Sequence, residues 1–155
     1  MTVPNRAQML VGIQFVILGF LALAIVLLPA QSGTGARVLG VLLALSSAGV
    51  FVSAFMAHNR TNAAMPNVSP VPKQNVELVT HGIYAHIRHP IYTGVLLVTL
   101  GVACWHGHGV AFALFAALVV LFWVKSRYEE TLLRAQFPDY AAYMQRTGRF
   151  LPVRF

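Results

Sequence analysis

Residues 9–28 read MLVGIQFVILGFLALAIVLL, a run of 20 residues with no charged side chain and with Gln14 as its one strongly polar residue. About 20 apolar residues, each rising about 1.5 Å, cross the roughly 30 Å hydrocarbon core of a bilayer. A secretory signal peptide has a shorter apolar region of about 7–15 residues, followed by a small-residue cleavage site. The sequence Leu28-Pro29-Ala30 fits such a site poorly, so we expect residues 9–28 to be a retained membrane span.

The rest of the chain repeats this apolar character. Residues 38–56 form a second uncharged run, and two shorter runs at 91–105 and 110–124 flank His106-Gly107-His108-Gly109, which predicts a helical hairpin over 91–124. The chain is 57% hydrophobic and 10% charged, whereas soluble domains carry roughly 25% charged residues. We therefore expect an all-α, polytopic membrane protein. The prediction is one domain, 1–155, with four spans at about 9–28, 38–56, 91–107 and 109–125, a loop over 58–90 and an amphipathic helical tail over 126–155.

The distribution of basic residues predicts the topology. The formal net charge is +7, but the basic residues lie at the ends of apolar runs and are not interleaved with aromatic residues, which argues against a nucleic-acid partner. With four spans, ten of the 11 Lys and Arg residues share one side with both termini, and Arg37 alone lies on the other. The positive-inside rule then puts both termini, the loop and the tail in the cytoplasm, and we expect a bacterial-type inner membrane.

Acidic residues are rare and lie on the predicted cytoplasmic side. There are four of them: Glu77, Glu129, Glu130 and Asp139. Glu129 and Glu130 are adjacent at the end of the last predicted span, where an unpaired acid costs desolvation energy. They are expected either to be neutralised by Arg127 or Arg134 on the same helix or to hold a cationic ligand.

A second polar cluster, residues 80–94, enters the third predicted span. It contains His81, His86 and His89 together with an arginine and two tyrosines. Pro90 suits the first turn of a helix, and Gly94 leaves room for a close approach to the backbone. An interfacial belt explains Tyr84, Arg88 and Pro90, but it explains three histidines and Gly94 poorly. The histidines lack an obvious fourth ligand, so we expect no metal site.

The run Arg88-His89-Pro90-Ile91-Tyr92-Thr93-Gly94 resembles the Arg-His-Pro-x-Tyr-x-Gly motif of isoprenylcysteine carboxyl methyltransferases. The later acidic pair of that family resembles Glu129-Glu130, followed by Phe137-Pro138-Asp139-Tyr140 and then by a basic stretch and Pro152. The resemblance runs from about Gln74 to Pro152. Related membrane enzymes that methylate phospholipid amines or small thiols share the cofactor half, so the motif identifies the cofactor better than the acceptor.

The resemblance implies S-adenosylmethionine as cofactor and S-adenosylhomocysteine as product. The implied catalytic residues are His89 and a basic residue that faces the substrate carboxylate, Arg127 or otherwise Lys125. Glu129 or Glu130 would hold the amino group of the cofactor, and residues 76–79 would line its adenosine. The implied cofactor residues are Gln74, Val76, Glu77, Leu78, Val79, Tyr84, His89, Pro90, Ile91, Tyr92, Gly94, Glu129 and Glu130.

The function implied is methylation of the carboxylate of a lipophilic, isoprenylcysteine-like substrate at the cytoplasmic membrane face, with membrane lipids as surroundings. A carboxylate needs no general base, whereas an amine or thiol acceptor would need a proton removed, and His89 or His86 would be the candidates. A non-enzymatic four-helix membrane subunit is the alternative from another class. The sequence leaves the acceptor and the oligomeric state open.

Overall fold

Four long helices and two short ones make up the part of the chain that the computed structural model describes, residues 3–63 and 76–153. They are α1 (Val3–Leu27), α2 (Thr34–Asn62), the 3-10 helix η1 (Gly82–Ala85), α3 (Pro90–His106), α4 (Gly109–Gln136) and α5 (Tyr140–Arg146). Within these ranges no strand forms, and the one isolated β-bridge pairs Ile87 with Gly148. The predicted all-α fold is confirmed.

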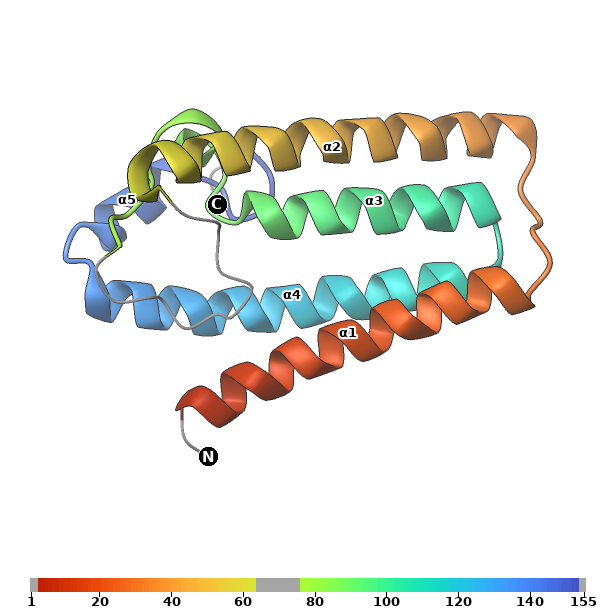
Figure 1. The fold of residues 1–155 in the computed structure, drawn as a ribbon, viewed down its shortest axis with the longest axis horizontal. Helices are drawn as coiled ribbons and strands as arrows, with labels where there is room; N and C mark the ends of the chain where they lie inside the picture. The colour runs from red at the N-terminus through yellow and green to blue at the C-terminus, as the bar shows by residue number, and fades with distance from the viewer. Residues whose placement is uncertain (1–2, 64–75, 154–155) are drawn as a thin grey trace.

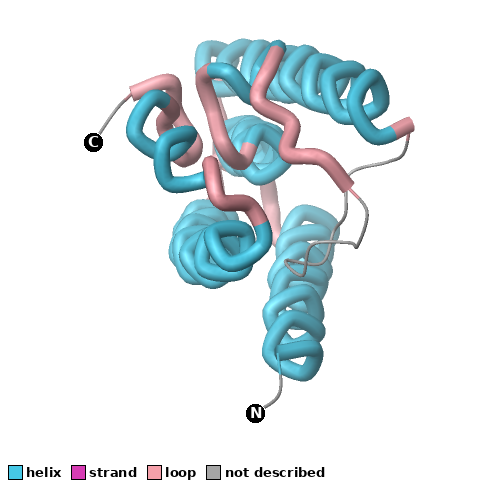
Figure 2. The backbone as a smooth tube through the Cα atoms, turned by 90° about the vertical axis from the view of Figure 1, so that its left-hand side faces the viewer, coloured by secondary structure: helices cyan, strands magenta, loops and turns pink. Residues whose placement is uncertain are grey.

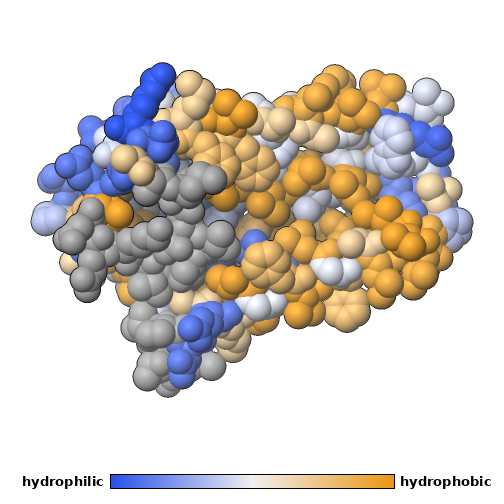
Figure 3. Space-filling model, in the orientation of Figure 1, coloured by the Kyte–Doolittle hydropathy of each residue, from blue (hydrophilic) through white to orange (hydrophobic). Residues whose placement is uncertain are grey.

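Three of the helices are long and apolar enough to cross a membrane: residues 5–27 of α1, all of α2 and all of α4. The fourth apolar helix, α3, has 17 residues and so extends about 25 Å, slightly less than a hydrocarbon core. Large apolar side chains face outward along the bundle, including Phe20, Leu45 and Val120 at 56%, 64% and 64% exposure. Figure 3 shows this apolar surface over the length of the helices, with hydrophilic residues gathered at the ends.

Helices α2 and α3 pack side by side because glycines let their backbones approach closely (Figure 1). A Cβ atom on Gly40 would lie 2.6 Å from the carbonyl oxygen of Gly101, so no larger residue fits without a shift of the backbone. Small residues at a helix interface are the usual means of association within membranes. Nearer the start of α3, the Ser47 hydroxyl donates to the Gly94 carbonyl at 2.8 Å.

The α3–α4 hairpin turns within two residues. Gly107 ends α3 in the left-handed region, with φ at 76°, and its N–H donates to the Ala103 carbonyl at 2.8 Å. A Cβ there would also meet the Ser32 backbone at 2.6 Å, so the turn requires glycine. His108 caps α4, its Nδ1 accepting from the Val110 N–H at 3.2 Å. The hairpin sends α4 back along α3, while α1 lies obliquely along α4.

One end of the bundle, which we call the polar end, consists of residues 76–89 and 137–153. Figure 2 looks onto this end and shows these loops and α5 lying across the ends of the long helices. There α2 and α4 finish and α3 begins, so the two sequence motifs converge on this end.

Candidate functional site

A backbone pairing at the polar end brings the C-terminal segment onto the start of α3. Arg88 N–H donates to the Gly148 carbonyl at 2.9 Å, Gly148 N–H donates to His86 at 2.9 Å, and His89 N–H donates to Arg149 at 3.1 Å. A Cβ on Gly148 would lie 1.7 Å from the Leu151 carbonyl oxygen, so only glycine permits this fold-back. The pairing places Arg149 beside Arg88, although 61 positions separate them in the chain.

Glu130 is the centre of a buried ion network. Its carboxylate accepts from Arg88 Nε at 2.9 Å and from Arg149 Nη2 at 2.6 Å, and it contacts His89 Nε2 at 3.3 Å. The Glu130 side chain is only 3% exposed. Arg88 is held further by the carbonyl oxygens of Met144 and Thr147. Glu130 thus joins α4, the start of α3 and the C-terminal segment, and its charge is matched by residues far away in the sequence.

Glu129 lies in a different environment. Its Oε2 accepts from the Tyr92 hydroxyl at 2.8 Å and lies 3.4 Å from His89 Nδ1. The Glu129 side chain is 21% exposed, and among the described residues no arginine forms an ion pair with it. The adjacent acids therefore differ: Glu130 is saturated with cations, whereas Glu129 remains partly open.

His89 bridges the two acids from the N-cap of α3. Burial alone lowers the pKa of His89, but hydrogen bonds to Glu129 and Glu130 and their negative charges outweigh it, so its pKa lies above the ordinary 6.5. The imidazole is 6% exposed and stacks on Tyr92, with ring centroids 5.3 Å apart. The site favours the cationic form of His89, which suits a residue that orients carboxylates better than one that accepts a proton.

Tyr92 is the centre of an aromatic stack that reaches into the bundle. Its ring also stacks on Phe122 of α4 at 4.8 Å. Lys125 Nζ lies 5.1 Å from the centroid of the Tyr92 ring, and it donates to the Gln14 side-chain oxygen of α1 at 2.7 Å. Lys125 is 0% and Gln14 7% exposed. Lys125 therefore faces the interior of the bundle.

Three tyrosines, Tyr84, Tyr140 and Tyr143, lie at the polar end. Burial, together with the Glu129 charge, raises the pKa of Tyr84 to about 12. Burial is also the largest cause that raises the pKa of Tyr140 and of Tyr143, whose hydroxyl donates to the Tyr84 carbonyl at 2.6 Å. All three hydroxyls stay protonated near neutral pH and act as hydrogen-bonding groups.

The segment expected to line an adenosine, residues 76–79, is tied to the end of α2. Asn62 donates to the Glu77 carbonyl at 3.2 Å and accepts from the Glu77 N–H at 2.8 Å. Val79 is buried, whereas Glu77 is exposed. Gln74, the remaining residue of this prediction, lies outside the described residues.

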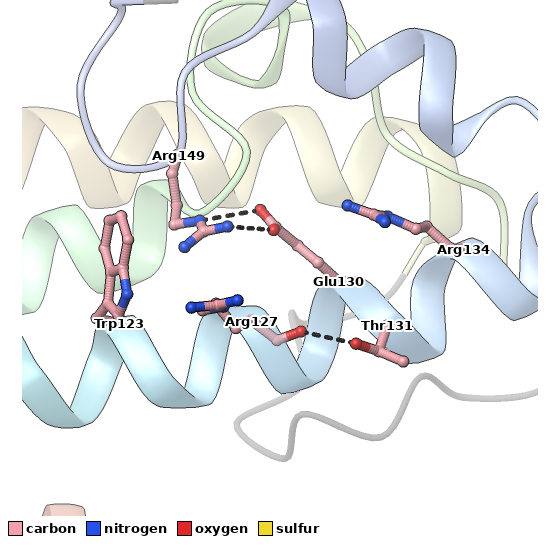
Figure 4. Close-up of a pocket in the computed structure, with 6 residues that line it drawn as sticks. All are labelled: Trp123, Arg127, Glu130, Thr131, Arg134 and Arg149. Atoms are coloured by element: carbon pink, nitrogen blue, oxygen red, sulfur yellow. Dashed lines mark hydrogen bonds and ion pairs between the residues drawn. The ribbon is translucent and has the colours of Figure 1, made fainter. Parts of the chain in front are cut away.

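A pocket of about 260 Å³ opens on the outer face of α4 next to Glu130 (Figure 4). Its lining residues are Trp123, Arg127, Glu130, Thr131, Arg134 and Arg149. The guanidinium of Arg149 lies over the Trp123 ring at 4.5 Å and pairs with Glu130. The pocket lining has three arginines and a single acid, Glu130. Because Glu130 also pairs with Arg88 and His89, the pocket keeps an excess of positive charge and favours an anionic ligand.

The structure brings together most of the residues that the sequence indicated. His89, Tyr92, Glu129 and Glu130 are in direct contact, Pro90 is buried as the first residue of α3, and Ile91 beside it is half-buried. Arg127 lies on the outer face in the pocket. Gly94 lies one turn deeper, and its close approach is made by Phe51 of α2, whose ring carbons would be 2.9 Å from a Cβ.

Sequence reasoning gave no role to three residues of this network. Gln14 was noted only as the one strongly polar residue of the first span, although its isolation there was a usable signal. Arg88 belongs to the motif quoted above and also fits an interfacial belt, but it carries no individual role there, and Arg149 lies in an unspecified basic stretch. His81 and His86 are exposed, and within the described ranges no group of three or more His, Cys, Asp or Glu side chains is placed to hold a metal ion.

Helices of membrane-spanning length that converge on a buried acid–histidine–tyrosine network describe a class of helical membrane protein, and comparison with known proteins identifies its family. The phospholipid methyltransferase family matches residues 35–140, and the chain belongs to this family. The resemblance to the related isoprenylcysteine carboxyl methyltransferases is thereby confirmed at the level of the family. Its family and its apolar helices of membrane-spanning length identify it as an integral membrane protein.

Two curated relatives match about half of the chain. The cobalt-zinc-cadmium resistance protein CzcN of Cupriavidus metallidurans is 36% identical over 81 residues, which are 52% of this chain and 38% of that protein. The nickel-cobalt-cadmium resistance protein NccN of Alcaligenes xylosoxydans xylosoxydans is 35% identical over 82 residues, again 52% and 38%. The matched stretch thus spans well under half the length of either relative.

Proposed function

We propose that this protein methylates the carboxylate of a lipophilic, isoprenylcysteine-like molecule at the cytoplasmic face of the membrane. The observation that carries the proposal is the meeting of both motif halves at His89, which lies 3.4 Å from Glu129 and 3.3 Å from Glu130. S-adenosylmethionine supplies a methyl carbon that its sulfonium already activates. The main task of the protein is therefore to orient two bound molecules and to exclude water.

The residues at the polar end fit such a cofactor. Glu129 is the better candidate to hold the cationic amino group, since it is partly exposed and Glu130 is already matched by two arginines. His89 and the Tyr92 hydroxyl hold the Glu129 carboxylate in place. Residues 76–79, which Asn62 holds in place, offer backbone groups and the apolar Val76 and Val79 to an adenosine. Tyr84, Pro90 and Ile91 are further residues that we assign to the cofactor site.

Arg127 is assigned to the acceptor. It lines the positively charged pocket, and a guanidinium binds a carboxylate through paired hydrogen bonds. Trp123, Val120 and Val124 lie on the same part of α4 and are 51%, 64% and 42% exposed, so an apolar tail can remain in lipid while its carboxylate enters the pocket. A substrate held in this way reaches the site sideways from the bilayer.

The raised pKa of His89 favours an acceptor that is already anionic. A higher pKa shifts His89 toward its protonated form, which accepts no further proton, and a carboxylate acceptor needs no general base. Attack by an anion on a cation removes charge, which a site poor in water promotes. N-methylation of a phospholipid amine is the second candidate reaction, because the matched family is described as phospholipid methyltransferase. In that case the pocket would hold the phosphate, whereas a small thiol would leave the apolar face of α4 unused.

A methyl-transfer assay with radiolabelled S-adenosylmethionine tests the proposal. The protein, purified in detergent, is offered a prenylcysteine analogue, phosphatidylethanolamine vesicles and a small thiol. We expect label in the prenylcysteine as a base-labile ester, and we expect Arg127→Gln to raise the KM for this acceptor by about tenfold. Ala135→Gln, an exposed change on the same helix outside the pocket lining, is the matched control. If label appeared only in the vesicles, the methyl acceptor would be the phospholipid amine and not a carboxylate.

A further inference from the structure

Lys125 is a cation within a membrane-spanning helix that has no counter-ion in direct contact among the described residues. Its side chain is 0% exposed, and the ion pairs of Glu129 and Glu130 are made with His89, Arg88 and Arg149. The neighbours of its ammonium are a neutral amide, Gln14 Oε1 at 2.7 Å, and two aromatic rings. Burying an ammonium away from water costs free energy unless an anionic partner neutralises it.

Attachment of α1 does not explain this lysine. Leu10, Ile17 and Leu18 of α1 already pack against Leu118 and Leu121 of α4 in one apolar cluster. A buried charged or polar contact is often no more stabilising than apolar residues of the same size. The ammonium is therefore better explained by a ligand than by the packing of the two helices.

The position of Lys125 indicates what kind of ligand that is. It lies four residues before Glu129 in α4, so the two side chains share a helix face one turn apart, and their charges interact. Arg127, by contrast, is about 200° around the helix from Lys125 and lines the outer pocket. An interior pair of one cation and one partly open acid complements a zwitterion, such as the amino-acid end of S-adenosylmethionine.

We propose that Lys125, held by Gln14 of α1, binds the carboxylate of the cofactor's methionine moiety while Glu129 binds its amino group. The inference rests on the proposed function, because it concerns the same cofactor site. An ammonium has three N–H donors, and Gln14 takes one of them in an orientation that keeps the nitrogen near the Tyr92 ring. Gln14 lies outside the stretch 35–140 that the family matches, so α1 contributes a positioning residue from beyond that stretch.

Calorimetric titration with three ligands separates the roles. S-adenosylhomocysteine carries both charged groups, its decarboxylated analogue 5′-(3-aminopropylthio)adenosine keeps only the amine, and 5′-methylthioadenosine has neither. We expect Lys125→Met to weaken S-adenosylhomocysteine binding by about tenfold and to leave the other two ligands within about twofold. Glu129→Gln is expected to weaken both amine-bearing ligands and to leave methylthioadenosine unaffected.

A second variant protects the test against misfolding. Gln14→Glu keeps α1 joined to Lys125 through an ion pair, but the new carboxylate neutralises the ammonium that the ligand would need. The variant should therefore fold and bind S-adenosylhomocysteine more weakly, with the affinity for the other two ligands unchanged. A residue that only joined the helices would tolerate this change. Phe15→Leu, at a 58% exposed position of the same helix, is the control.

The outcomes are distinct. Equal affinity for S-adenosylhomocysteine in the wild type, Lys125→Met and Gln14→Glu would overturn the inference and leave the proposed function standing. A raised KM for the acceptor with unchanged S-adenosylhomocysteine affinity would assign Lys125 to the acceptor carboxylate and likewise overturn it. A wild-type protein that binds none of the three ligands would contradict the proposed function itself.

Discussion

Two adjacent glutamates perform different tasks because a helix turns by about 100° per residue and points them at different neighbours. Glu130 points at Arg88 and Arg149, and it is buried with them. Glu129 points at Tyr92 and His89 and keeps a fifth of its side chain exposed. The first arrangement holds segments together, and the second leaves an acid that can receive a cationic ligand.

The residue-scale prediction follows from this difference. Replacing Glu130 by Gln leaves Arg88, Arg149 and His89 with an uncompensated buried charge, and removing one partner of such a network costs about 3–5 kcal/mol. Glu129→Gln should lower the free energy of unfolding by much less, because that side chain is more exposed. Thermal unfolding of both variants in detergent measures the difference. Equal losses for the two variants would contradict the division of tasks.

The motif residues were predictable from the sequence one at a time, but their partners were not. The pattern around His89 and the pair Glu129-Glu130 both indicated a site, and the structure brings them into contact. Arg127 and Arg134, the expected partners of the acids, line the pocket instead, while Arg88 and Arg149 neutralise Glu130. Local spacing cannot reveal a pairing that depends on the C-terminal segment folding back at Gly148.

At the scale of elements, the α2–α3 pair determines where the start of α3 lies. Its closeness depends on Gly40 and Gly101, whose backbones touch where any Cβ would intrude. Gly94 and Ser47 continue the contact toward the polar end. A shift of α3 against α2 would displace His89 and Tyr92 together.

We therefore expect Gly40→Ala to destabilise the protein by about 1–3 kcal/mol, the usual cost of overpacking. Gly49→Ala in the same helix is the matched control, because a Cβ there meets nothing within 4 Å and alanine favours the helix. The midpoint of thermal unfolding in detergent measures both. A Gly40→Ala protein as stable as the control would show that the two helices can separate without cost.

At the scale of the whole molecule, the asymmetry of charge and the position of the site make one topological prediction. The polar end holds both motif halves, and the positive-inside rule puts it in the cytoplasm. With Cys104 replaced by Ser, a cysteine at Ala135 should be protected from a membrane-impermeant maleimide in intact cells, and one at Thr34 should react. Both positions are exposed in the fold. The reverse labelling pattern would put the site on the wrong side for cytoplasmic cofactor.

Local patterns in the sequence were sufficient to predict the lipid environment and the family of this protein. Uncharged runs of membrane length dictate helices, because lipid offers no partner for an open backbone, and the ordered motifs indicated a methyltransferase before any contact was known. The tertiary structure decided how each charge is used. Glu130 forms an ion pair with Arg149, whereas the Glu129 side chain stays partly exposed. Lys125 donates a hydrogen bond to Gln14 across 111 positions of the chain. Burial and distance between segments remote in sequence set these roles, and neither is written in local spacing.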